Sequence, residues 1–111
     1  MISALSSRRV FAYSEPVDMR KSFNGLISLT TQVLGEDPLS QKLFLFGNRR
    51  KNIVKILFWD RTGFCIYAKR LERGRFQFRR GELSARELEL MLDGIILGGR
   101  HGKRNAVHNL V

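Results

Sequence analysis

The chain reads Ile53-Val54-Lys55-Ile56-Leu57-Phe58-Trp59-Asp60-Arg61-Thr62-Gly63-Phe64-Cys65-Ile66-Tyr67-Ala68-Lys69-Arg70-Leu71 at its centre. Residues 53–59 and 64–71 are rich in β-branched and aromatic side chains, and residues 60–63 supply the turn formers Asp and Gly. This pattern predicts two strands that pair antiparallel as a hairpin.

Both faces of this hairpin are expected to be largely apolar. If the turn brings Trp59 opposite Phe64, strand alternation fixes the remaining partners. One face then holds the pairs Trp59–Phe64, Leu57–Ile66 and Lys55–Ala68, and the other holds Phe58–Cys65, Ile56–Tyr67 and Val54–Lys69. A slip of one residue would exchange the two faces.

Shorter strands are expected on both sides of the hairpin. Residues 43–46 precede it through a connection rich in glycine and asparagine, so they should join the sheet antiparallel. Residues 8–13 read as a strand that ends before Pro16, because proline cannot donate to a strand ladder. Residues 76–78 are a candidate for one more short strand.

An amphipathic helix is expected after the first strand. Asp18 is a good N-cap, and Gly35 is placed to end the helix. Between them, apolar and small residues recur at three- and four-residue spacing: Met19, Phe23, Leu26, Ile27, Thr30, Val33 and Leu34.

A second amphipathic helix is marked by the capping box Ser84-x-x-Glu87 and is expected to stop near Gly94. The predicted fold class is α+β, an antiparallel meander sheet of three to five strands with two helices packed mainly on one face. The other face would then be aromatic and basic, suited to stacking nucleobases or burying a dimer interface. The alternative is that the N-terminal strand and the loops cover it.

The length of 111 residues fits a single domain, expected over residues 1–97. Residues 98–111 combine glycine with charge and lack an apolar period, so a flexible basic tail is expected there. Twenty Lys and Arg against ten Asp and Glu give a formal net charge of +10. Such a balance indicates a polyanionic partner such as DNA, with a merely solubilising surface as the alternative.

The basic residues gather in clusters along the chain. The candidate nucleic-acid-binding residues are Arg20, Lys21, Arg49, Arg50, Lys51, Lys55, Lys69, Arg70, Arg73 and Arg75, and Arg79 with Arg80 form a further pair. Adjacent hairpins should bring several of these clusters onto neighbouring rims of the sheet. Any single cluster also fits an ordinary solvated turn. Arg20 and Lys21 are expected in a first helical turn, where the dipole disfavours cations. This placement indicates a functional use or an ion pair, with Asp18 or another acidic residue as the ordinary partner.

The sequence predicts no enzyme and no cofactor. The histidines, His101 and His108, fall in the expected tail, and Cys65 reads as a small core residue. Asp18, Asp60 and Glu72 could be imagined as an acidic triad for a metal ion. Each has a simpler interpretation, as a helix cap, a turn former and an ion-pair partner, so no catalytic or metal residue is predicted.

The chain is expected to be cytoplasmic and not associated with a membrane. Its first nine residues lack the continuous apolar stretch of a signal peptide. Nor does any run approach the roughly 18 apolar residues that a membrane span needs.

Three motifs stand in order across residues 8–96: Asp18-Met19-Arg20-Lys21-Ser22-Phe23-Asn24-Gly25-Leu26, then Val54 to Cys65, then Lys69-Arg70-Leu71-Glu72-Arg73-Gly74-Arg75-Phe76. Together they resemble the small accessory protein, TnpB or second-open-reading-frame protein, of transposable elements of insertion-sequence family 66. Ser22 and Asn24 depart mildly from the family pattern.

The resemblance implies a non-enzymatic accessory role in DNA transposition, beside a separate transposase of the same element. Charge and aromatic content suggest that this role is exerted by binding DNA or the transposase–DNA complex. The alternative is a protein-interaction adapter for the transposase that has no direct DNA role. An exposed apolar face would also permit a homo-oligomer.

Overall fold

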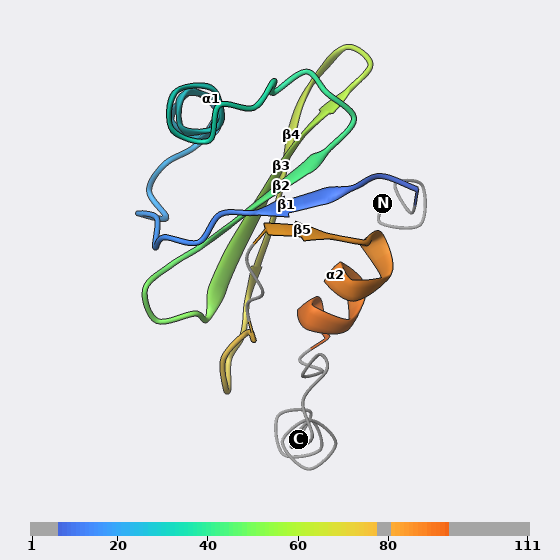
Figure 1. Cartoon of the computed structure of the whole chain (residues 1–111). Coiled ribbons are helices and arrows are strands. Elements are labelled where there is room, and N and C mark those ends of the chain that lie inside the picture. Colours follow the sequence, from blue (N-terminus) through green and yellow to red (C-terminus); the bar gives the residue numbers. More distant parts are fainter. Residues whose placement is uncertain (1–6, 78–80, 94–111) are drawn as a thin grey trace.

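The structure is a computed structural model that describes residues 7–77 and 81–93. Five strands form one sheet in the order β4-β3-β2-β1-β5 (Figure 1). They are β1 (Val10–Ala12), β2 (Leu43–Gly47), β3 (Ile53–Asp60), β4 (Gly63–Arg70) and β5 (Gly81–Leu83). Strands β2, β3 and β4 form the expected antiparallel meander, whereas β1 runs parallel to β2 and antiparallel to β5. The α+β class is confirmed, with a sheet that is mostly antiparallel.

The β3–β4 hairpin pairs in the register that the sequence predicts. Trp59 lies opposite Phe64, and every later pair, out to Val54 opposite Lys69, follows from this one. The rings of Trp59 and Phe64 meet edge to face with their centroids 5.1 Å apart. Both faces of the hairpin are apolar, as expected, and each contributes to a separate hydrophobic cluster.

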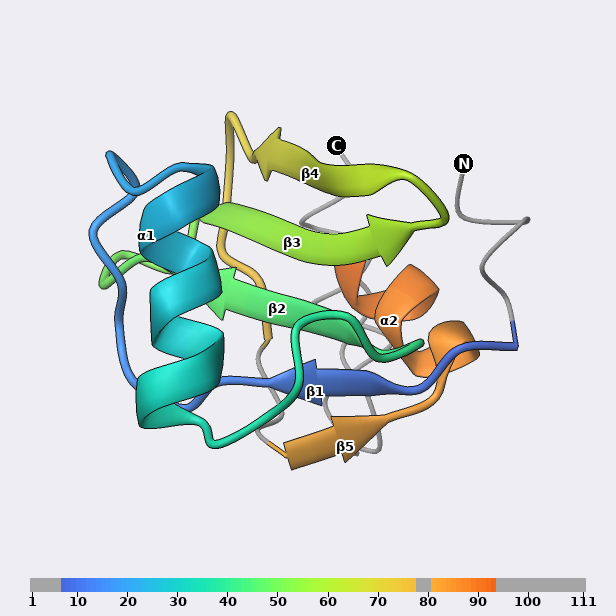
Figure 2. The same cartoon turned by 90° about the horizontal axis from the view of Figure 1, so that it is seen from above.

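The two helices lie on opposite faces of the sheet, so the expectation that both pack mainly on one face is wrong (Figure 2). Helix α1 (Phe23–Ser28) continues into one turn of π-helix, η2 (Leu29–Val33), and α2 (Ala85–Leu92) covers the other face. The physical reason is that alternate side chains of the strands make both faces of the sheet apolar, so each face needs a helix to shield it from water. The open aromatic face that the sequence suggested is therefore occupied by a helix.

On the first face, Leu26 of α1 is fully buried against Phe44, Phe46 and Leu57. The hydroxyl of Thr30 is also buried there, and it is satisfied by donating to the carbonyl oxygen of Leu26 over 2.8 Å. Such back-bonding of a threonine to the preceding turn removes the cost of burying its hydroxyl.

The start of α1 differs from the prediction that Asp18 caps the helix. The carboxylate of Asp18 instead accepts hydrogen bonds from the backbone N–H and the guanidinium of Arg20. It thus closes a local turn, and the helix begins only at Phe23, after Ser22. The end agrees with expectation, because Gly35 follows η2 with a φ of +66°, a conformation that glycine adopts without strain.

Helix α2 begins with the predicted capping box. The N–H of Glu87 donates to Oγ of Ser84 over 3.1 Å, and the N–H of Ser84 donates to Oε1 of Glu87 over 2.9 Å. The helix ends at Leu92, with Asp93 as its C-cap. Its buried side chains are Ala85, Leu88, Met91 and Leu92.

Phe76 is 1% exposed and belongs to the cluster under α2, but neither Phe76 nor Gln77 is in a strand. The expected strand at 76–78 is thus not found at its first two positions, and β5 forms at Gly81–Leu83 instead. Phe78, Arg79, Arg80, Gly94 and the tail predicted at 98–111 lie outside the described residues.

Candidate nucleic-acid interface

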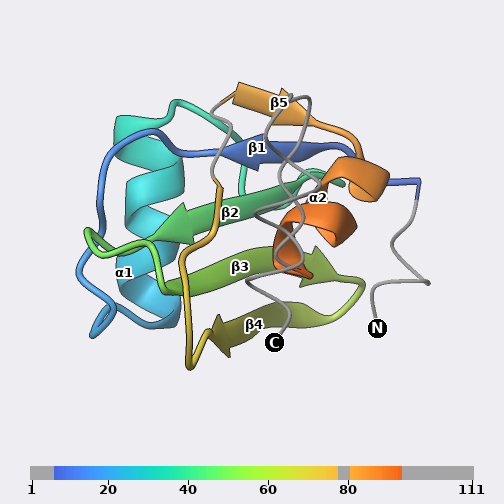
Figure 3. The ribbon, with the colours of Figure 1, turned by 90° about the horizontal axis from the view of Figure 1, so that it is seen from below.

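Several basic segments meet at one end of the sheet, where β1, β2 and β4 finish and β3 begins (Figure 2). The segments are the connection 48–52 between β2 and β3, the loop that follows β4, and the segment between β1 and α1. Figure 3 shows the chain after β4 running back past the ends of β3 and β2. We call this region the basic end of the sheet.

Two backbone hydrogen bonds tie the loop after β4 to the β2–β3 connection. The N–H of Leu71 donates to the carbonyl oxygen of Asn52 over 2.8 Å, and the N–H of Phe76 donates to that of Lys51 over 2.7 Å. Between these two points the loop turns at Gly74, whose φ is +75°. The loop is therefore anchored at both of its ends against the connection.

The β2–β3 connection is itself ordered by a side chain. Oδ1 of Asn48 accepts from the N–H groups of Asn52 and Ile53, each over 3.1 Å. Lys51 sits in this turn with a φ of +61°, a conformation in the left-handed region. The bonds to Asn48 hold the backbone closed around Arg49 and Arg50.

The anchored loop and the connection together line a hollow of about 420 Å³. Its lining residues are Arg49, Arg50, Asn52, Leu71, Glu72, Arg73, Gly74 and Arg75. Glu72 is the acidic member, and its carboxylate accepts from Nε of Arg70 over 3.0 Å. Arg49, Arg50, Arg73 and Arg75 form no ion pair with any residue in the described part of the chain. We call these four side chains the arginine cluster.

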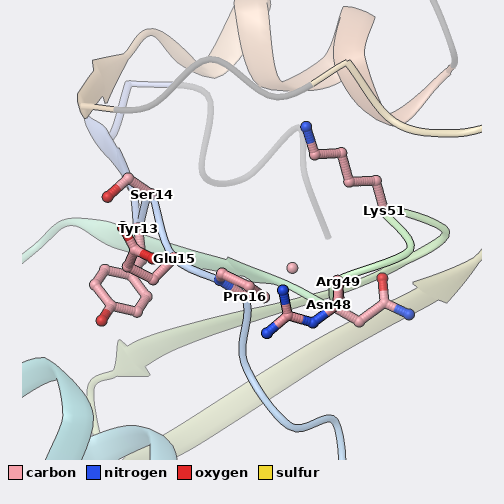
Figure 4. A pocket seen from close by; sticks show the side chains of 8 residues that line it. Tyr13, Ser14, Glu15, Pro16, Asn48, Arg49 and Lys51 are labelled. Atoms are coloured by element: carbon pink, nitrogen blue, oxygen red, sulfur yellow. The ribbon is translucent and has the colours of Figure 1, made fainter.

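A second hollow, of about 220 Å³, shares Arg49 with the first, and Figure 4 shows the side chains that line it. It lies between the segment after β1 and the β2–β3 connection, and it is lined by Tyr13, Ser14, Glu15, Pro16, Gly47, Asn48, Arg49 and Lys51. In Figure 4 the side chain of Arg49 extends toward Pro16. The hydrogen bond from the N–H of Val17 to the carbonyl oxygen of Gly47, 2.8 Å long, fixes this wall.

Two of the candidate lysines make structural contacts. Nζ of Lys55 donates to the carbonyl oxygens of Met19 and Lys21, each over 2.8 Å, and so fastens the turn before α1 to β3. Nζ of Lys69 donates to the carbonyl oxygen of Leu92 over 2.8 Å, at the C-terminal end of α2. A cation at that end of a helix is also favoured by the helix dipole.

Arg20 is paired with Asp18, one of the partners considered from the sequence, over 2.6 Å. The hydrogen bonds from the Arg20 side chain and N–H, reinforced by its charge, lower the pKa of Asp18 from 3.8 to about 2. The same contact raises the pKa of Arg20. Arg20 and Lys21 precede α1, so the helix-dipole cost expected for them does not arise.

The structure thus brings together the arginine cluster and places Lys51 beside it. It does not bring Lys55 and Lys69 into that hollow, and Arg70 is turned to Glu72. Sequence reasoning counted asparagine among the turn formers of this connection but did not assign the Asn48 side chain the role of closing the turn.

The acidic residues weighed as a metal triad do not converge. Asp60 lies at the β3–β4 turn, at the opposite end of the sheet from Asp18 and Glu72. Within residues 7–77 and 81–93, no three His, Cys, Asp or Glu side chains are grouped so as to hold a metal ion. Cys65 is half-buried against the α2 cluster, and His101 and His108 lie outside the described residues.

None of the helices in the described part of the chain has the length and apolar character needed to cross a membrane.

Residues 8–101 match the family model described as IS66 Orf2 like protein. The chain therefore belongs to this family, and the resemblance noted from the sequence is confirmed. Two relatives come from Sinorhizobium fredii (strain NBRC 101917 / NGR234), the proteins y4jC and y4hO, both described as uncharacterized. The first is 32% identical over 100 residues, covering 86% of each chain. The second is 33% identical over 100 residues, covering 86% of this chain and 87% of the relative. No solved structure matches the chain.

Proposed function

We propose that this protein is a non-enzymatic accessory factor in the transposition of IS66-type elements, and that it binds DNA, alone or in complex with the transposase. The observation that carries the proposal is the arginine cluster, in which four guanidinium groups from two separate segments line one hollow. Family membership supplies the setting of transposition. The positive charge and N–H donors of the four guanidinium groups favour an anionic ligand such as the DNA phosphates.

Guanidinium groups suit phosphate oxygens because they offer planar, paired donors and stay charged at every working pH. Arginines already paired with carboxylates lose this capacity, whereas the arginine cluster has no carboxylate partner among the described residues. Lys51 in the adjoining hollow adds a further cation. We assign phosphate contacts primarily to Arg49, Arg50, Lys51, Arg73 and Arg75.

The remaining candidates have supporting roles in this proposal. Lys55, Lys69 and Arg70 position the backbone and the loop through their contacts within the chain. Arg20 and Lys21 lie on the α1 side of the basic end and add positive potential there. Such a field speeds the encounter with a polyanion, although Asp18 offsets part of it.

Contacts to phosphates position a protein on DNA without reading the sequence. Because the proposed contacts come from loops rather than from a helix laid in the major groove, we expect little discrimination between DNA sequences. The test is binding of element-end DNA against scrambled DNA of equal length at two salt concentrations. We expect similar affinities for both DNAs and a marked loss at the higher salt. Salt-independent binding, or none at low salt, would contradict the proposal.

An adapter that contacts only the transposase is the second candidate. The observation in its favour is that Phe23 and Val33, on the outer side of α1 and η2, are 46% and 58% exposed. Exposed apolar side chains mark protein contact sites where they form one patch, whereas single ones are normal on a protein surface. In a transposition assay with the transposase supplied, the adapter predicts that Phe23→Ser with Val33→Ser abolishes activity while Arg73→Glu with Arg75→Glu does not. The DNA-binding proposal predicts a loss with the arginine reversals.

The non-enzymatic part of the proposal is tested with the pure protein. We expect DNA to remain uncut in the presence of magnesium or manganese ions. Asp60→Asn and Glu72→Gln should leave DNA binding intact, because neither carboxylate contributes a phosphate contact. Metal-dependent cleavage that either substitution abolishes would show a nuclease instead.

A further inference from the structure

The two edge strands of the sheet differ in how well they are protected against pairing with a strand of another molecule. β5, at one edge, has three residues, and its Glu82 lies 3.9 Å from Arg9 and 3.6 Å from Lys42. β4, at the other edge, has eight residues, and β3 is its one partner among the described strands. Residues 64–68 of β4 carry no charge and no proline, and their register with β3 is unbroken. Edges that avoid pairing are usually short, charged or bulged, and this part of β4 is none of these.

Alternate residues of β4 direct their backbone N–H and C=O groups away from β3. The N–H of Leu71 donates to the carbonyl oxygen of Asn52, and these two residues form the next pair after Ile53–Arg70 in the β3–β4 register. Hydrogen-bonded pairs alternate along an antiparallel ladder, so the backbone groups of the odd-numbered residues of β4 point toward β3. The even-numbered residues therefore present their donors and acceptors at the open edge: Phe64, Ile66, Ala68 and Arg70. The side chains of Phe64 and Ile66 are partly exposed, and those of Ala68 and Arg70 are exposed.

We propose that β4 is a self-association surface, which pairs antiparallel with β4 of a second copy to form one sheet across both molecules. A two-fold contact of this kind satisfies the outward groups of both strands at once. It also shields the partly exposed Phe64, Ile66 and Tyr67 from water.

The charge distribution favours a second copy in the antiparallel orientation. Lys69 and Arg70 lie at the basic end of β4, whereas the turn at the other end holds Asp60 and Arg61, 4.0 Å apart, and so carries no net charge. Antiparallel pairing brings the basic end of each copy toward the 60–63 turn of the other. Parallel pairing would set two basic ends side by side in a chain whose net charge is +10, which Coulomb repulsion opposes.

The geometry has a consequence for the basic ends. In the antiparallel pair they lie at opposite ends of the shared β4 ribbon, on the order of 25 Å apart for eight residues at about 3.3 Å each. The pair would then present two separate phosphate-binding sites. This last step rests on the proposed function, whereas the pairing of the strands does not.

The test is analytical ultracentrifugation of the full chain, freed of nucleic acid and held in high salt, from about 1 to about 500 μM. We expect a reversible monomer–dimer equilibrium. Ala68→Lys adds a charge at the open edge and should weaken the dimer about tenfold or more. The matched control is Gln32→Lys, which adds the same charge on the exposed side of η2 and should leave the dimer unchanged.

Two further measurements keep the test decisive. Ala68→Pro removes an outward N–H that makes no hydrogen bond within residues 7–77 and 81–93, so it should also weaken the dimer. If this variant does not fold, Ala68→Lys decides alone. Amide exchange should slow with concentration at Ile66 and Ala68, while Cys65 and Tyr67 stay protected throughout. A monomer at every concentration, or a dimer that neither Ala68 variant weakens, would overturn the proposal. Monomers whose β4 pairs with a strand of another protein would overturn it as well.

Discussion

The N–H of Phe76 donates to the carbonyl oxygen of Lys51 over 2.7 Å. This bond joins the loop that carries Arg73 and Arg75 to the turn that carries Arg49 and Arg50. The ring of Phe76 is 1% exposed in the cluster beneath α2, so the loop is also held by hydrophobic packing. The arginine cluster depends on this anchor, because the two segments are more than twenty residues apart in the chain.

Replacing Phe76 with alanine should lower the free energy of unfolding by about 3–5 kcal/mol, since a large buried ring is lost and a cavity remains. Denaturant-induced unfolding measures the change. The control is Gln77→Ala, at the exposed neighbouring position, which should change stability by no more than about 0.5 kcal/mol. A small loss for Phe76→Ala would show that the loop is not anchored through its ring.

Replacing Lys55 with methionine removes the two hydrogen bonds from its ammonium to Met19 and Lys21. We expect a loss of about 1–3 kcal/mol in unfolding free energy, because bonds from a charged donor are involved. The matched control is Lys21→Met, which removes the same charge from an exposed side chain and should cost far less. Equal losses for the two variants would mean that Lys55 has no structural role.

The pKa of Asp18 should be about 2 in the folded protein, because Arg20 holds its carboxylate by hydrogen bonds. The folded value is lower than that of the unfolded chain, so the pair favours the folded state above about pH 4 and this contribution is lost as pH falls through about 2. NMR titration of the carboxylate checks the value. Arg20→Ala should return the pKa toward 3.8, and an unchanged value would show that another group lowers it.

The capping box of α2 should contribute measurably to stability. Ser84→Ala removes the acceptor for the N–H of Glu87, and we expect a loss of about 1 kcal/mol. Ser84→Asp keeps a capping oxygen and should retain most of the stability. Thermal unfolding of both variants makes the comparison. A similar loss for the two would indicate that the side-chain cap does not stabilise the helix.

The hairpin could be predicted from the sequence because its signals are local. A short turn and strict alternation place Trp59 opposite Phe64, and all further pairs follow. The capping box is local in the same way. Both features were predicted correctly and depend on few distant contacts.

The features that were predicted wrongly depend on long-range geometry or on competition between partners. Periodicity gives each helix an apolar stripe but does not say which face of the sheet receives it. The position of Asp18 suggests a helix cap, yet its carboxylate accepts hydrogen bonds from the N–H and the guanidinium of Arg20 instead of capping the helix. The strand expected at 76–78 is not found at Phe76 and Gln77, because Phe76 is buried as a loop anchor rather than paired in the ladder.

The candidate site was only partly predictable for the same reason. The sequence identifies every basic residue, but not that Leu71 and Phe76 would be tied to the β2–β3 connection. Nor does the sequence show that the ammonium groups of Lys55 and Lys69 donate hydrogen bonds to backbone carbonyl oxygens. These contacts separate the arginine cluster from the other cations, and they follow from tertiary structure alone.

We propose that nucleic acid binds at the arginine cluster and not over the whole positive surface. The most direct measurement is DNA affinity by fluorescence anisotropy across a series of salt concentrations, for two double variants that each remove two cations. Arg73→Ala with Arg75→Ala changes the cluster, whereas Arg61→Ala with Arg86→Ala changes exposed arginines at the far turn and on α2. We expect the slope of log affinity against log salt to fall by about two units for the first pair and little for the second. Equal effects of the two pairs on affinity and slope would contradict it.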